Sequence, residues 1–122
     1  MSGVIHFEIN ADDPGKIIDF YTSVFGWKIE KWEGGQEYWL IYPQGEEGIG
    51  GGIGRKDPAM TAESVINTIG VESVDACIRK IYQAGGEVVR PKMAIPGIGW
   101  LAYIRDIEGN LFGIMEADAQ AK

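Results

Sequence analysis

The chain is poor in cysteine and in cations, and each shortage excludes a class of protein. Cys77 is the only cysteine among 122 residues, so an internal disulfide and a zinc site built on paired cysteines are both excluded. Eleven Lys and Arg residues stand against eighteen Asp and Glu residues, which gives a formal net charge of -7. Because phosphate binding requires clustered cations, this charge argues against nucleic acids and anionic membranes as partners.

Long apolar segments are missing as well. No apolar run approaches the roughly 18 residues that a membrane-spanning helix needs. The first residues lack a basic stretch followed by a long apolar run, so we expect no signal peptide. A reducing, cytoplasmic location is the prediction that follows.

The residues that are present are typical of a soluble globular protein. Hydrophobic residues make up 45% of the chain and charged residues 24%. The length predicts a single domain over residues 1–122. The 18 glycines predict tight turns and kinked strands.

An alternating segment predicts a first strand at residues 4–10. Its apolar side chains share one face and its polar side chains share the other: Ile5, Phe7 and Ile9 against His6, Glu8 and Asn10. We expect the apolar face to pack against helices, which leaves the polar face for a cavity or for water.

The order of elements then repeats. A helix is expected from Pro14 to Gly26 with Asp13 as its cap, and a second begins after Ser73. Further strands are expected at 27–32, 37–42, 49–55, 65–71, 87–90, 100–105 and 111–115. The order is β-α-β-β-β twice, a repeat of about 60 residues. We assign module 1 to about residues 1–56, a linker to about 57–63 and module 2 to about 64–122, which places the fold in the α+β class.

The polar face of the first strand is the best candidate for chemistry. His6 is the only histidine, and Glu8 shares its face, so the two form a candidate acid–base or metal-binding pair. The alternative is a solvated face, or a histidine that is merely hydrogen-bonded. Aromatic side chains are the expected apolar walls of a small-molecule pocket, and Trp39 and Trp100 are the candidates.

Other kinds of site find less support. The glycine-rich segment at 48–54 matches no dinucleotide or phosphate-binding motif, so we expect a strand that bends or lies close to a ligand. Cys77 shares an apolar helical stripe with Val74, Ile78 and Ile81, which favours a packing role over a nucleophilic one.

Several short motifs carry a family resemblance over nearly the whole chain. They are Ile-Asp-Phe-Tyr (18–21), Val-Phe-Gly-Trp (24–27), Val-Glu-Ser-Val-Asp (71–75), Gln-Ala-Gly-Gly (83–86) and Arg-Asp-Ile-Glu-Gly-Asn (105–110). With the double β-α-β-β-β order, the chain resembles the vicinal oxygen chelate superfamily, which includes glyoxalase I, bleomycin-resistance proteins and extradiol dioxygenases. The resemblance implies two βαβββ modules that form an open, curved mixed-sheet barrel, and a homodimer.

The resemblance also implies a divalent metal held by His, Gln or Glu side chains from the first and last strands of each module. His6 matches the first of these positions. Ile66 and Gly113 occupy two others and offer no ligand atom, so the usual set is incomplete. Three other residues are candidate replacement ligands: Glu8, Asn67 and Glu116. Glu8 is favoured because it shares the strand face of His6.

Three functions follow from the resemblance. The first is a small-molecule-binding protein. If it is an enzyme, we expect a lyase or isomerase that transfers a proton next to a carbonyl group. His6 would be the base or a metal ligand, and Glu8 its partner. The second is a non-catalytic protein that sequesters a drug or ligand. The third is glyoxalase I (lactoylglutathione lyase), whose substrate carboxylates would need a cation from Arg55, Arg90 or Lys92.

Overall fold

The computed structural model describes residues 2–58 and 64–122. Contacts divide the chain into a first unit, residues 6–66, and a second unit, residues 1–5 with 67–122. The elements follow the predicted β-α-β-β-β order twice, which confirms the α+β class. Of the expected linker at 57–63, residues 59–63 lie outside the described residues.

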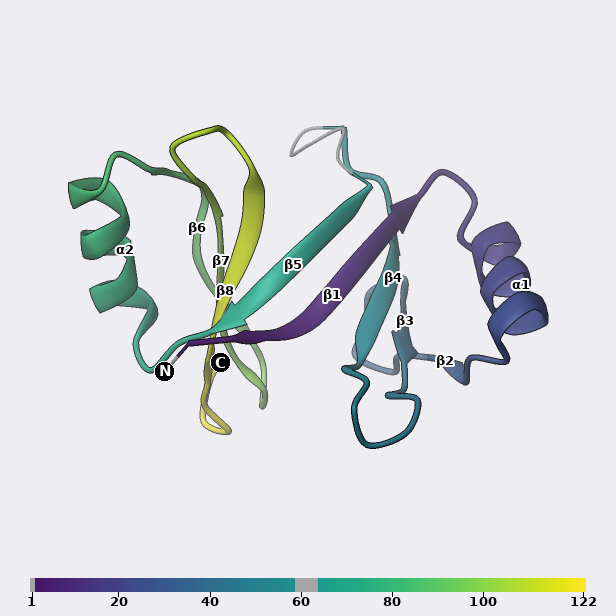
Figure 1. The fold of residues 1–122 in the computed structure, drawn as a ribbon. Coiled ribbons are helices and arrows are strands. Elements are labelled where there is room, and N and C mark those ends of the chain that lie inside the picture. The colour runs from purple at the N-terminus through teal and green to yellow at the C-terminus, as the bar shows by residue number, and fades with distance from the viewer. Residues whose placement is uncertain (1, 59–63) are drawn as a thin grey trace. The chain divides into compact units, whose positions relative to one another are not determined.

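In the first repeat, one helix accompanies strands that are ordered β2-β3-β4-β1 (Figure 1). The elements are β1 (Val4–Ala11), α1 (Pro14–Phe25), β2 (Ile29–Lys31), β3 (Tyr38–Ile41) and β4 (Gly51–Arg55). Strand β1 pairs with β4 in parallel, while β2, β3 and β4 pair antiparallel. The core of this unit is a cluster of Ile9, Ile41 and Ile53, against which residues of α1 pack.

The ends of α1 are set by local chemistry, as predicted. The Asp13 side chain accepts a hydrogen bond from the backbone N–H of Lys16, and Pro14 occupies the first helical turn, where its missing N–H costs nothing. Gly26 ends the helix with a φ of 69°, a left-handed conformation that glycine adopts without steric penalty.

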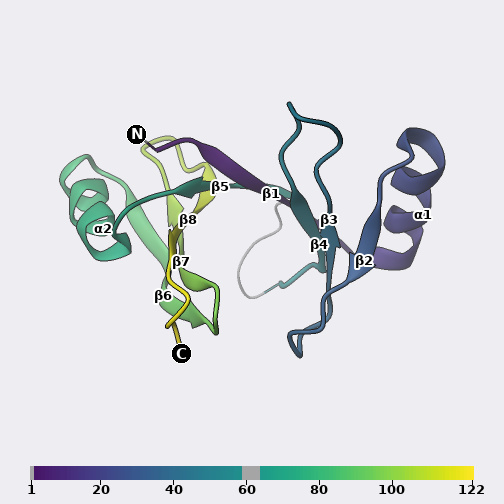
Figure 2. The same ribbon diagram turned by 90° about the horizontal axis from the view of Figure 1, so that it is seen from below.

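The second repeat has the same plan with the strand order β5-β8-β7-β6. The elements are β5 (Val65–Gly70), α2 (Val74–Gln83), β6 (Glu87–Ile95), β7 (Gly99–Arg105) and β8 (Leu111–Ala117). Figures 1 and 2 show α2 beside β6, β7 and β8, and its residues pack against a buried cluster of Val74, Ala102, Ile104 and Ile114. Cys77 belongs to that packing, as its position on the apolar stripe predicted.

Strand β6 begins at Glu87, as predicted, and continues beyond the predicted residues through Pro91 to Ile95. Proline has no N–H for the ladder, but β6 is the last strand in its order and pairs only with β7. The pairing shifts register on both sides of Arg90, which accommodates the proline. Within residues 2–58 and 64–122, neither helix is long and apolar enough to cross a membrane.

Candidate functional site

His6 lies on the polar face of β1, as the alternation predicted. The neighbouring Phe7 and Ile9 pack with the α1 cluster, so His6 and Glu8 point to the opposite face of the first unit's sheet. His6 is half-buried, and this burial lowers the pKa of its imidazole from the ordinary value because the charged form loses hydration. At neutral pH the ring is therefore uncharged and can take up a proton.

The partner of His6 comes from two strands away. Its Nε2 lies 2.9 Å from the hydroxyl oxygen of Tyr38, on β3. Strand β4 stands between β3 and β1, and the phenol crosses it over Gly52 and Gly54. A Cβ atom at Gly52 would overlap the end of the phenol ring, so the missing side chain is what makes room for the contact.

Trp39, a predicted pocket wall, lies on the face of that sheet opposite to His6. It packs against the α1-side cluster, because neighbouring residues of a strand alternate between faces. It borders a groove of about 660 Å³ whose lining also includes Lys31, Trp32 and Arg55 but not His6. Tyr38, one residue earlier, is the aromatic side chain that faces the histidine.

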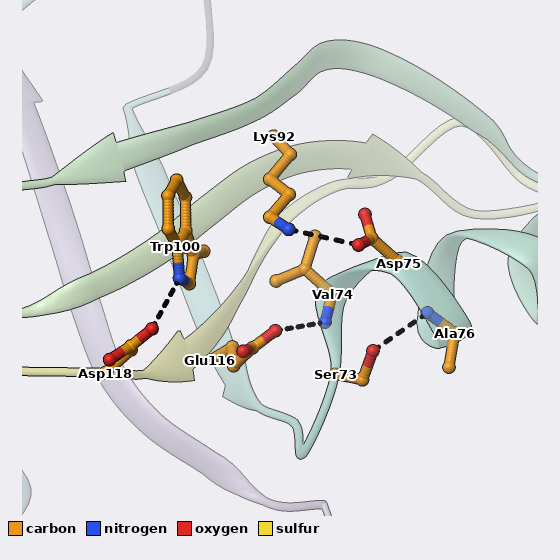
Figure 3. A network of polar contacts seen from close by, with 8 residues as sticks. All are labelled: Ser73, Val74, Asp75, Ala76, Lys92, Trp100, Glu116 and Asp118. Carbon is orange, nitrogen blue, oxygen red and sulfur yellow. Dashed lines mark hydrogen bonds and ion pairs between the residues drawn. The ribbon is translucent and has the colours of Figure 1, made fainter. Parts of the chain in front are cut away.

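Trp100 is held in a polar network on the α2 side of the second unit (Figure 3). Its indole Nε1 donates a hydrogen bond of 2.9 Å to Asp118, and this bond is the main cause of a lowered Asp118 pKa. Lys92 Nζ lies 4.7 Å from the centre of the ring and also pairs with Asp75 at 3.0 Å. These contacts tie β6, β7, α2 and the C-terminal residues together.

The other candidate ligands have structural surroundings of their own. The Glu116 carboxylate accepts a hydrogen bond of 2.9 Å from the backbone N–H of Val74, at the start of α2 (Figure 3). Asn67 is exposed on β5. Of the cations proposed for a substrate carboxylate, Arg55 pairs with Glu37 at 2.7 Å and Lys92 with Asp75.

The amino-acid sequence of the chain is similar to that of a known protein superfamily. Residues 3–114 match the model of the Glyoxalase/Bleomycin resistance protein/Dioxygenase superfamily. The chain belongs to this superfamily. Proteins from Mycobacterium tuberculosis and Mycobacterium bovis that carry the provisional name glyoxylase CFP32 are 27% identical over 115 residues, or 93% of the chain. The chain spans only 43% of the length of these relatives.

Solved structures of other proteins share the fold. A methylmalonyl-CoA epimerase from Mycobacterium tuberculosis aligns with a TM-score of 0.67 at 19% identity, covering 95% of this chain and 88% of the other. A hypothetical protein, BH1468, from Bacillus halodurans aligns with a TM-score of 0.66 at 18% identity, covering 99% and 98%. At these identities the likeness concerns the glyoxalase-like fold alone.

Within this fold, His6 and Tyr38 have no polar counterparts in the second repeat. Glu8 pairs with Gly52 as Thr68 pairs with Gly113, so the two repeats can be matched position by position. By that register, Ile66 stands where the first repeat has His6, and Leu101 stands where it has Tyr38. The second repeat therefore repeats the backbone plan with apolar side chains at the positions of His6 and Tyr38.

The residues present do not fit the divalent metal that the superfamily implies. Ile66 has no donor atom, and Gly52 and Gly113 have no side chain. Among the described residues, no three His, Cys, Asp or Glu side chains come close enough together to hold a metal ion. Three protein ligands are usual even in an open catalytic site, so we derive no step through a metal at His6.

Tyr38 is the site residue that the sequence analysis did not single out. Its strand was predicted, but periodicity alone left open which of its two faces meets His6. The usable signal was the glycine-rich strand: Gly52 and Gly54 alternate, so both lack a side chain on one face. When one face of a central strand carries only glycine, a large side chain from the neighbouring strand can lie across that face.

Proposed function

We propose that the protein binds a small organic molecule on the polar face of the first unit and transfers a proton next to a carbonyl group, as a lyase or isomerase. The observation that supports this most directly is the half-buried His6, whose pKa is lowered by burial and whose Nε2 contacts Tyr38. A neutral imidazole at physiological pH is a competent general base. Glu8, on the same strand face, is the candidate second acid–base group.

The proposed step balances with these groups alone. The imidazole of His6 takes a proton from the carbon beside the carbonyl, and the electrons of that C–H bond form the double bond of an enolate. The carbonyl electrons move to oxygen, which the polar face stabilises. Return of a proton to the same carbon, or to its neighbour, gives the isomer. The structural likeness to a methylmalonyl-CoA epimerase supports this reaction class, because epimerisation is a proton removed and returned.

A non-catalytic binding protein is the second proposal, and the missing donor side chains at Ile66 and Gly113 favour it. Sequestering a ligand needs no metal and no proton transfer. Lactoylglutathione lyase activity ranks third, because two of its three candidate cations, Arg55 and Lys92, already hold carboxylates of the chain. A homodimer and a cytoplasmic location belong to all three proposals.

Solvent exchange at carbon separates these proposals. Methylmalonyl-CoA and the methylglyoxal–glutathione adduct would each be incubated with the protein in D₂O, and loss of the proton beside the carbonyl would be followed by NMR. We expect exchange with one probe, reduced at least about 100-fold in His6→Ala, the usual contribution of a general base. Tyr42→Phe, which removes an exposed hydroxyl bonded to Glu30, is the matched control and should exchange normally.

Each result has a clear meaning. Unchanged exchange in His6→Ala would refute a role for His6 in the reaction. Saturable binding of a probe without exchange, weakened by His6→Ala, would replace the enzyme with the binding protein.

A further inference from the structure

We propose that Tyr38 is the positioning residue of the site. It accepts a hydrogen bond from the Nε2–H of His6 and thereby leaves Nδ1 as the atom that takes up the substrate proton. This rests on the proposed function only for the identity of the base. The placement of the imidazole itself is a property of the protein alone, and can be measured without a ligand.

The two ring nitrogens of His6 have different roles when the imidazole is neutral. A neutral imidazole carries one proton, so one nitrogen donates and the other accepts. Tyr38 Oη lies 2.9 Å from Nε2. If His6 is to act as a base, its lone pair must be on the nitrogen that the tyrosine does not contact. The contact and the chemistry agree only when Nε2 carries the proton and Nδ1 is free of it.

The phenol is itself held in place from two sides. On β4, Gly52 has no side chain, and the end of the phenol ring occupies that space. A Cβ atom at Gly54 would lie 3.6 Å from the nearest atom of the phenol ring. On the other side, the indole of Trp32 meets the ring edge-on, with centroids 6.1 Å apart and an interplanar angle of 81°. A side chain confined in this way can fix the orientation of the imidazole that it contacts.

Comparison with the second repeat supports a role in which Tyr38 acts together with His6. There Leu101 takes the place of Tyr38, and its Cδ1 would lie 3.5 Å from a Cβ at Gly113. An apolar side chain can therefore pack over the glycine, and this packing needs no hydroxyl group. At this strand position the first repeat, which has His6, has the tyrosine hydroxyl, and the second repeat, which has Ile66, has Leu101.

The test uses the only histidine of the chain as its reporter. In protein labelled with ¹⁵N, the two ring nitrogens of His6 give the tautomer and its titration directly. We expect the Nε2–H tautomer in the native protein. Tyr38→Phe should give a mixture of tautomers and lower the His6 pKa further, by about half a pH unit or more, because the imidazolium loses a stronger hydrogen bond than the neutral ring does.

Glycine variants supply the matched comparison. Gly52→Ala inserts a methyl group where the phenol lies and should change the His6 spectrum as Tyr38→Phe does. Gly54→Ala, on the same strand and face, should leave it close to native, as should Tyr42→Phe. Should Gly52→Ala fail to fold, Tyr38→Phe still decides, since it removes one oxygen atom only.

Three results would overturn the proposal: a native Nδ1–H tautomer, a His6 pKa that rises in Tyr38→Phe, or a His6 spectrum that Tyr38→Phe leaves unchanged. These differ from failure of the proposed function. If no probe exchanges its carbon-bound proton, the proposed function fails, but the tautomer measured for His6 is unaffected. If a probe exchanges normally and Tyr38→Phe leaves the His6 spectrum unaltered, only the positioning role of Tyr38 fails.

Discussion

Glu116→Ala should destabilise the protein by removing a structural contact at the start of α2. Its carboxylate accepts the backbone N–H of Val74, a residue with 0% of its surface exposed (Figure 3). The first N–H groups of a helix have no partner within the helix, so they need one from outside. The neighbouring Ser73 side chain serves the N–H of Ala76, which leaves Glu116 as the acceptor for Val74.

The magnitude follows from these contacts. Leaving a buried N–H without an acceptor costs about 1–3 kcal/mol. A carboxylate at a helix N-terminus adds about 0.5 kcal/mol through the helix dipole. We therefore expect Glu116→Ala to lower the free energy of unfolding by about 2 kcal/mol, most of it from the lost acceptor. Glu116→Gln keeps an acceptor oxygen and should lose only the charge contribution, about 0.5 kcal/mol.

Urea unfolding followed by circular dichroism measures both variants, with equal m-values as the condition for comparing them. Glu47→Ala, which removes the same charge from an exposed loop, is the control and should be close to native. Equal losses in Glu116→Ala and Glu116→Gln would show that charge, not the hydrogen bond, matters. A loss below about 0.5 kcal/mol in Glu116→Ala would refute the structural role.

Three further predictions concern groups whose surroundings are equally specific. Burial lowers the pKa of His6 in the folded protein, so the unfolded chain binds more protons below about pH 6.5. The free energy of unfolding should therefore fall as the pH drops through that range. His6→Gln should remove this part of the pH dependence, as measured by unfolding at a series of pH values. Burial raises the pKa of the Cys77 thiol, so Ellman's reagent should react slowly with the folded protein and rapidly in denaturant; equal rates would contradict its packing on α2. Ile53, with 0% exposure, should cost about 2–5 kcal/mol when replaced by alanine, against a small effect for the 73%-exposed Ile107 in the same unfolding assay.

Local signals in the sequence were enough for the backbone plan. Asp13 and Ser73 accept the hydrogen bonds expected of helix caps, and Gly26 has the left-handed conformation expected of a helix end. Strand alternation also gave the correct face for His6, because Phe7 and Ile9 were apolar and needed a helix to cover them. These features depend on residues a few positions apart.

The candidate site was harder to predict because its contacts join distant strands. Tyr38 and His6 are 32 positions apart and meet over a third strand. Adjacent aromatic residues at 38 and 39 point to opposite faces, and only the register with β4 shows which of them lies on the side of His6. In the same way, the hydrogen bond from the Trp100 indole N–H to Asp118 joins residues 18 positions apart, which local periodicity does not show.

The two repeats together show which residues serve the fold and which are left for chemistry. Both repeats pair a polar residue of the first strand with a buried glycine of the last, Glu8 with Gly52 and Thr68 with Gly113, so that pairing belongs to the backbone plan. His6 and Tyr38 have only apolar counterparts, although the second repeat folds on the same plan without them. Groups that the fold does not require, placed in contact on a half-buried face, are where a reaction or a binding specificity should first be sought.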